Sequence, residues 1–214
     1  MKLSSKAQDV FNEIKSNTAK LGDVRALAKT IKKDHALAME LWSTGAFLAR
    51  QLAILIMDKK FLTREKIDEL VKDISGHEEE EKSQLIDWLM ANQLSKDKKT
   101  IALMESWELS STPLLRRVFW YYQGRLRWVG QTPPPNSEQL LAAIEKRIED
   151  ESPEVQWAMN FAAAQIGIFE PGYRSRCIRL GERTGLYKDE IVHRNCTPKY
   201  LPEWIAAQVA KMKK

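Results

Sequence analysis

Residues 114–128 combine arginines with aromatic residues and include no acid. The cations and rings of this stretch, in chain order, are Arg116, Arg117, Phe119, Trp120, Tyr121, Tyr122, Arg125, Arg127 and Trp128. Guanidinium groups bind phosphate through paired hydrogen bonds, and aromatic faces pack on sugars or bases. The pattern therefore favours nucleic-acid binding. The alternative is that the rings are core residues and the arginines pair with acids on adjacent helices.

A second candidate for chemistry is Asp87, a lone carboxylate in the largely apolar stretch from Ser83 to Met90. On a helix, Ser83, Asp87 and Ala91 are four residues apart, so they form a stripe of small residues beside the apolar face. The alternative interpretation is a solvated or salt-bridged surface acid, which is the common situation for such a residue.

Metal and cofactor chemistry has little support. The soft-ligand cluster is Cys177, His193 and Cys196, whereas a structural zinc site needs four ligands at tighter spacing. We interpret these residues as two buried thiols and a surface imidazole. Gly181 and Gly185 match neither a Walker pattern nor a dinucleotide-binding pattern. We therefore expect no metal and no cofactor.

The charge of the chain is mildly positive and unevenly distributed. Among 214 residues, 34 lysines and arginines stand against 29 acids, a formal charge of +5. No acid occurs between Glu108 and Glu138, and Glu182 is the one acid among five cations from Pro171 to Lys188. This excess permits an anionic partner without requiring one. The chain has no apolar run of membrane-spanning length, no signal segment at its start and only two cysteines, so we expect a cytoplasmic protein.

Helices must position these candidates, because strand-like alternation is missing and helical spacing of apolar residues is common. Apolar faces of this kind fall within residues 48–56, 85–90, 114–122 and 155–166. Thr112 and Ser152 each supply a capping hydroxyl before a proline, and Thr63 precedes another helical start. The sequence predicts an all-α fold.

The helices recur at a regular distance. Starts near residues 47, 80, 113 and 153 are about 33 to 40 residues apart, a spacing typical of two-helix solenoid repeats. Such pairs must stack to bury their apolar faces, so the second helices line up and form a basic concave groove. We predict one α-solenoid domain over residues 1–214, with helical repeats in 1–170, a stiff loop from Gln131 to Asn136, and a C-terminal capping segment in 171–214. Beyond Gly172 the pattern is irregular until a short basic helix that runs to Lys214.

Five segments carry a resemblance to a known family. They are Leu37–Trp42, residues 47–53, Ser83–Leu94, Trp107–Arg117 and Val155–Asn160. Together they resemble the bacterial AlkD-type DNA alkylation repair proteins, which are HEAT-like helical solenoids. The resemblance covers most of the chain, most firmly residues 33–167. It implies that the protein wraps duplex DNA in the groove and excises cationic N3- or N7-alkylated purines without base flipping.

The resemblance also assigns roles. Asp87 matches the carboxylate that faces the deoxyribose, where an anion stabilises the positive charge that grows in the transition state. Arg117 matches the arginine that holds the DNA backbone, and the further DNA-binding residues expected with it are Arg116, Tyr121, Arg125 and Arg127. Ser83 and Phe161 occupy the two sugar-packing positions where the family has tryptophan, and Ala164 replaces a basic residue.

Three functions are open on these grounds. The first is a DNA N-glycosylase that acts on alkylated purines. The second is a non-catalytic relative that binds branched or damaged DNA, which the changes at Ser83 and Ala164 favour. The third is a protein-interaction scaffold that grips an acidic helix or tail. With either DNA function we expect a monomer whose partner is double-stranded, alkylated DNA, without membrane or metal, associated with a bacterial nucleoid.

Overall fold

A computed structural model describes residues 3–15, 20–128, 130, 132–194 and 196–212, in which the regular elements are all helical. Met1, Lys2, Gln131 and Lys214, which belong to predicted segments, lie outside the described residues. The chain divides into two compact units, residues 1–105 and residues 106–214. The prediction of an all-α fold is confirmed, whereas the single domain and the groove along it remain predictions.

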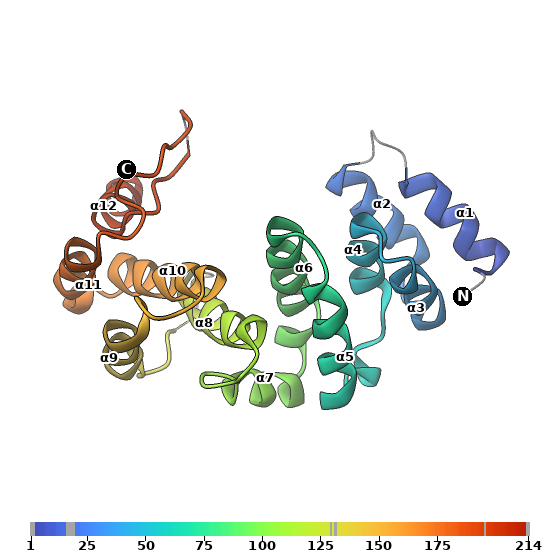
Figure 1. The fold of residues 1–214 in the computed structure, drawn as a ribbon, viewed down its shortest axis with the longest axis horizontal. Helices are drawn as coiled ribbons and strands as arrows, with labels where there is room; N and C mark the ends of the chain where they lie inside the picture. The colour runs from blue at the N-terminus through green and yellow to red at the C-terminus, as the bar shows by residue number, and fades with distance from the viewer. Residues whose placement is uncertain (1–2, 16–19, 129, 131, 195, 213–214) are drawn as a thin grey trace. The chain divides into compact units, whose positions relative to one another are not determined.

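Figure 1 labels the helices of both units. The first unit contains α1 (Ser5–Ile14), α2 (Leu21–Ile31), α3 (His35–Ser43), α4 (Phe47–Ile56), α5 (Arg64–Ser75), α6 (Glu79–Asn92) and α7 (Lys98–Glu105), with two 3₁₀ turns, η1 (Lys59–Phe61) and η2 (Leu94–Lys96). The second unit contains α8 (Pro113–Trp128), α9 (Ser137–Arg147), α10 (Pro153–Phe169), α11 (Pro171–Thr184) and α12 (Leu201–Met212). No helix in the described part of the chain is long and apolar enough to cross a membrane.

Most of the predicted helix starts are observed. Helices α8 and α10 begin at Pro113 and Pro153, where the missing proline N–H leaves no helical hydrogen bond unmade. The Thr63 side chain accepts a hydrogen bond from the backbone N–H of Lys66 at 3.3 Å and caps α5. Ser152 occupies the N-cap position of α10, but the capping role predicted for its hydroxyl is wrong: the hydroxyl is buried and has no hydrogen-bond partner among the described residues.

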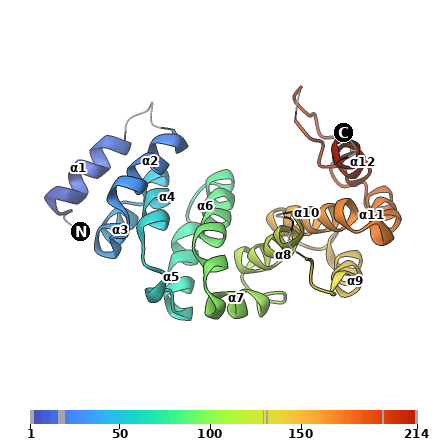
Figure 2. The ribbon, with the colours of Figure 1, turned by 180° about the vertical axis from the view of Figure 1, so that it is seen from behind.

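Within each unit the second helices of successive pairs pack on one another, as the repeat pattern predicts. In the first unit α4 contacts α2 on one side and α6 on the other; in the second unit α10 contacts α8 and α12. Within each unit the odd-numbered helices form a second layer, in which α1 contacts α3 in the first unit and α9 contacts α11 in the second. Figure 2 shows the same order from behind. The even-numbered helices carry every predicted site residue.

Helix α10 is the centre of the second unit and contacts all four other helices of that unit. Most of its side chains are buried from Val155 to Ile168, which is the pattern of a helix surrounded by neighbours rather than lying at a surface. The helix therefore fixes where α8 and α12 can present side chains.

The C-terminal segment is more regular than the sequence pattern indicates. Helix α11 occupies residues that we expected to be irregular, and it ends at Gly185, whose φ of +62° is the left-handed conformation that glycine adopts most easily. The helical period is hard to recognise because arginines, not apolar residues, make many of the contacts between α11 and its neighbours. The predicted final helix is observed as α12.

Gly124 allows α8 and α10 to approach closely. A Cβ atom built on Gly124 would lie 2.5 Å from two ring carbons of Phe161 and 3.3 Å from the Cα of Ala162. Any larger side chain must displace the buried Phe161 ring, so the position of that ring depends on a glycine in the facing helix.

Replacing Gly124 with alanine should lower the free energy of unfolding by about 1–3 kcal/mol, the usual cost of overpacking a core. Urea denaturation measures this change. Gly22→Ala on α2 is the matched control, because a Cβ there meets no atom within 4 Å, and its stability should stay the same or rise slightly. Equal stability of Gly124→Ala and the native protein would contradict the close packing.

Candidate nucleic-acid interface

Helix α8 presents a stripe of alternating cations and rings. Arg117, Tyr121, Arg125 and Trp128 recur every three or four residues, so they share one side of the helix. The Arg125 guanidinium carbon lies 4.9 Å from the ring centroid of Trp128 and 5.8 Å from that of Tyr121. Trp128 is 52% exposed. No carboxylate pairs with Arg125 among the residues that the structure describes.

Aromatic residues of α10 and α12 continue this stripe. The ring of Phe161 stacks on that of Trp157 with centroids 5.6 Å apart, meets Tyr121 edge-on at 4.9 Å and lies 6.0 Å from Trp204. Trp157, Tyr121 and Trp204 are half-buried, whereas Phe161 is 8% exposed. The three helices thus present one group of rings, with Phe161 beneath the others.

Arg117 packs against one ring of this group, that of Trp157. Its guanidinium carbon lies 4.4 Å from the Trp157 ring centroid, and Nη1 donates a hydrogen bond to the carbonyl of Glu154 at 2.9 Å. The residue is 4% exposed. Such a contact holds a planar cation against an aromatic face.

We call these side chains the aromatic-basic face. Its members are Arg117, Tyr121, Arg125, Trp128, Trp157, Phe161 and Trp204. Stacked rings beside guanidinium groups are suited to nucleotides, because rings pack on bases or sugars and guanidinium groups donate hydrogen bonds to phosphate. Trp157 and Trp204 were not among the predicted site residues. The position of Trp157, one helical turn before Phe161, was a signal that could have identified it.

Arg127 has its donors engaged within the protein. It is 1% exposed; Nε pairs with Glu170 at 2.6 Å, Nη1 donates to the carbonyl of Gln123, and Nη2 donates to the side chains of Asn136 and Ser137. These bonds tie the end of α8 to the starts of α9 and α11. The alternative interpretation of the basic stretch, in which arginines pair with acids of other helices, describes this residue.

Arg116 is paired in a similar way. Its Nε and Nη2 donate to one carboxylate oxygen of Glu151 at 3.1 and 2.8 Å, and Nη1 donates to the carbonyl of Ser110 at 2.7 Å. These contacts join α8 to the loop before α10. Arg116 and Arg127 therefore have fewer N–H donors left for phosphate than Arg125 has.

The arginines of α11 are also largely neutralised. Arg176 makes a two-bond contact with Glu145 at 2.8 Å and bonds Glu138, while Arg183 pairs with Glu149. The Arg176 hydrogen bonds hold the pKa of the Glu145 carboxyl below its usual value. Two of the five cations in this part of the sequence, Arg176 and Arg183, therefore pair with acids on α9 and in the turn that follows it.

Asp87 lies on α6 as the spacing predicts. Asp87, Ser83 and Ala91 are half-buried, whereas Leu85 and Leu89 on the core side are fully buried, so the small-residue stripe runs beside the apolar face. The next residue, Trp88, points to other helices: its Nε1 donates to the carbonyl of Gln51 on α4 at 3.2 Å, and Arg25 of α2 stacks on its ring.

The predicted active-site residues belong to different units. Asp87 and Ser83 are part of the first unit, and Arg117 and Phe161 are part of the second. A site in which Asp87 meets Arg117 and Phe161 requires residues of both units, so it remains a prediction. The individual roles of these residues also remain predictions.

The two cysteines differ from each other. Burial raises the pKa of the Cys177 thiol to about 12, which makes it a poor nucleophile at neutral pH. Cys196 is exposed, so its predicted burial is wrong. No group of three or more residues suited to hold a metal is found in the described ranges.

The first unit also has a basic cavity that the sequence did not indicate. The cavity has a volume of about 610 Å³ and is lined by Lys59, Lys60, Arg64 and Lys99 against one acid, Asp97. The Lys59 amine donates to the carbonyl of Lys96 at 2.7 Å. The residues that line this cavity come from three separate elements, which is why no local cluster is visible in the sequence.

Comparisons with known proteins give the family from one match and the fold from another. The family model described as "DNA alkylation repair enzyme" matches residues 6–176. A solved structure described as "a new family of proteins related to the HEAT-like repeat DNA glycosylases with affinity for branched DNA structures" aligns with a TM-score of 0.69 and 17% identity, over 98% of this chain and 89% of that chain. The second likeness shows a HEAT-like repeat fold. No curated protein sequence gives a significant match.

The buried network around Arg127 yields a stability prediction. Arg127→Met leaves the Glu170 carboxylate without its cation, so the free energy of unfolding should fall by about 3 kcal/mol, the scale for breaking a buried ion pair. Urea denaturation measures the loss. Arg183→Met is the control, because the Arg183–Glu149 pair is exposed and should contribute less than about 1 kcal/mol. Similar losses in both variants would show that the Arg127 network is not a main support of the fold.

Proposed function

This chain belongs to the DNA alkylation repair enzyme family, and we propose that it binds DNA on the aromatic-basic face and hydrolyses the N-glycosidic bond of cationic N3- or N7-alkylated purines without base flipping. The observation that carries the proposal is the alignment of rings and guanidinium groups on α8, α10 and α12. Arg125, stacked between Tyr121 and Trp128, has no acid partner among the described residues, so its charge is available for phosphate.

The chemistry requires little of the protein. A purine alkylated at N3 or N7 carries a positive charge and is already a good leaving group, so the sugar develops the cationic character as the bond breaks. A carboxylate beside the deoxyribose stabilises that charge and helps to place water. Asp87 supplies the carboxylate in this proposal, Phe161 packs near the sugar, and Arg117 and Arg125 hold phosphate.

A non-catalytic DNA-binding function is the second candidate. Ser83 has no ring for sugar packing, and Phe161 is mostly covered by its neighbours. The aligned structure belongs to proteins described as having affinity for branched DNA structures. In this case the aromatic-basic face binds DNA, with strong dependence on salt because each phosphate contact releases counterions, and no base is released.

Asp87→Asn separates these functions. The substrate is duplex DNA that carries N7-methylguanine, and the measurement is abasic-site formation in single turnover. Removing the negative charge should slow excision by about 10²–10³-fold, the scale for loss of one electrostatic group, and leave DNA affinity nearly unchanged. Asp9→Asn, an exposed acid on α1, should keep the native rate.

Equal base release by the native protein and Asp87→Asn would show that Asp87 is not catalytic. DNA binding without base release would favour the second candidate. Negligible affinity for both plain duplex and branched DNA at physiological salt would contradict both and favour the protein-scaffold interpretation.

A further inference from the structure

A cavity in the second unit opens beside the aromatic-basic face. It has a volume of about 420 Å³ and is lined by Trp128, Phe161, Gln165, Ile168, Phe169, Thr197, Trp204, Gln208 and Met212. The residues come from α8, α10, α12 and the segment before α12. This volume falls within the range of about 300–1,000 Å³ that is usual for small-molecule sites.

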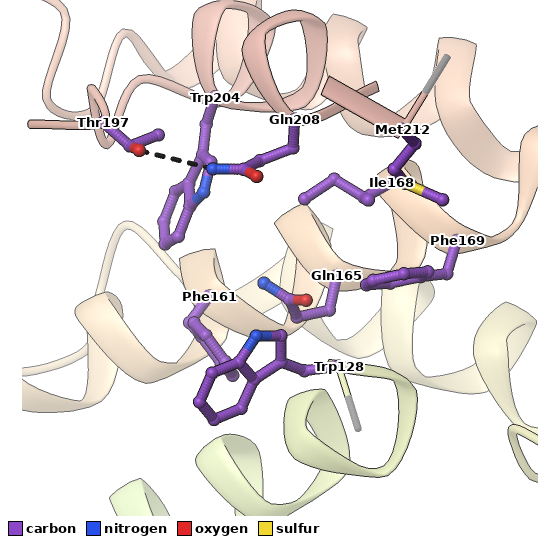
Figure 3. Close-up of a pocket in the computed structure, with 9 residues that line it drawn as sticks. All are labelled: Trp128, Phe161, Gln165, Ile168, Phe169, Thr197, Trp204, Gln208 and Met212. Carbon is purple, nitrogen blue, oxygen red and sulfur yellow. Dashed lines mark hydrogen bonds between the residues drawn. The ribbon is translucent and has the colours of Figure 1, made fainter. Parts of the chain in front are cut away.

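The chemistry of the lining selects a class of ligand. None of the nine lining residues carries a charge, and three of them, Trp128, Phe161 and Trp204, are aromatic residues of the aromatic-basic face. In Figure 3 the Gln165 amide lies between the indole of Trp204 and that of Trp128. Aromatic walls with a central amide suit a flat, neutral heterocycle that has hydrogen-bonding groups on its edge.

The side-chain oxygen of Gln165, a residue that lines the cavity, lacks a hydrogen-bond partner among the described residues. The residue is 4% exposed, and this oxygen is buried. An unpaired buried acceptor is costly, so native proteins satisfy nearly all of them. The terminal torsion of glutamine is soft, so a modest rotation turns the oxygen toward a donor in the cavity. Gln208, in contrast, already donates to the Thr197 hydroxyl at 3.3 Å.

A cation beside one lining residue of the cavity fits a ligand with a phosphate attached. Arg125 does not line the cavity, but its guanidinium carbon lies 4.9 Å from the ring centroid of Trp128, which does. A nucleotide whose base enters the cavity therefore has a cation near its backbone.

We infer that this cavity binds one unpaired nucleobase of DNA, with the base between the Trp128 and Trp204 rings and its N–H edge bonded to Gln165. The inference rests on the DNA binding proposed above, and it adds a site for a base that is not in a duplex. Such a site gives a preference for DNA with bulges, gaps or branches, where unpaired bases occur without the cost of opening a base pair.

The test compares the dissociation constants of three labelled DNA molecules by fluorescence anisotropy: a plain duplex, the same duplex with one extra thymidine, and that bulge with an abasic nucleotide in place of the thymidine. The native protein should bind the thymidine bulge about ten-fold more tightly than either of the other two, the scale of stacking one base on aromatic side chains. The abasic bulge controls for the bend and flexibility of bulged DNA.

Two variants remove the site in different ways. Gln165→Leu keeps the side-chain volume and removes the amide, and Trp128→Ala removes an exposed ring. Both should bind all three DNA molecules with similar affinity, and Gln165→Leu, which lies outside the aromatic-basic face, should keep the duplex affinity within about three-fold, well below the stacking effect. Leu109→Ala, an exposed apolar residue outside the cavity lining, should keep the ten-fold preference.

Gln165→Leu also gives a folding readout. Because the variant removes an unpaired buried oxygen, its melting temperature should equal or exceed that of the native protein. A variant that loses the thymidine preference while it melts as high as the native protein supports a binding role for the amide.

The outcomes separate the two proposals. Equal affinity for the bulges with and without the base, or an unchanged preference in Gln165→Leu and Trp128→Ala, overturns the base site and leaves duplex binding intact. Failure of the native protein to bind any of the three DNA molecules overturns both. Capture of an apolar peptide by the cavity, without any base preference, also overturns the base site.

Discussion

Close contact between α8 and α10 is the constraint on which the second unit depends. Because Gly124 has no side chain, the Phe161 ring lies directly against α8, at a place where a Cβ would be 2.5 Å from it. The ring is thereby held against Tyr121 and Trp157, and its centroid lies 6.0 Å from that of Trp204. A wider helix separation would move apart the rings that form the proposed DNA surface and one wall of the cavity.

Charge distribution follows from the same packing. The sequence contains two basic stretches, but most of their arginines have partners inside the second unit: Arg127 binds Glu170, Arg116 binds Glu151 and Arg176 binds Glu145. These pairs join α8 and α11 to neighbouring elements and neutralise three of the arginines. Arg117 and Arg125, both on α8, stack on rings of the aromatic-basic face.

Local features of the sequence predicted the helices well. Pro113 and Pro153 mark helix starts because proline restricts the chain at the first helical position, and Thr63 caps α5. The repeat spacing correctly indicated that second helices pack together. Helix α11 was missed because its contacts are made by arginines, which leave a weak apolar period. The exposure of Cys196 and the failure of Ser152 to cap depend on tertiary surroundings that neighbouring residues do not report.

The candidate site was harder to predict than the fold. The basic stretch identified α8, but not which arginines are engaged, because Glu151 and Glu170 lie 35 and 43 residues away in the chain. Trp204 and Gln165 join the site through the packing of α12 on α10. Asp87 could be placed on a helix and a face, since helical spacing alone determines that. Its relation to the sugar of a bound DNA depends on the ligand.

The most direct test of the account is the salt dependence of duplex DNA affinity in two arginine variants. Arg125→Gln removes a cation of the aromatic-basic face, and Arg179→Gln removes an exposed cation of α11 in the odd-numbered layer. The account predicts that the negative slope of log affinity against log salt concentration becomes smaller in magnitude by about one in Arg125→Gln. In Arg179→Gln the slope should stay at the native value. A native slope in Arg125→Gln together with a reduced slope in Arg179→Gln would place the DNA on the other layer and contradict the account.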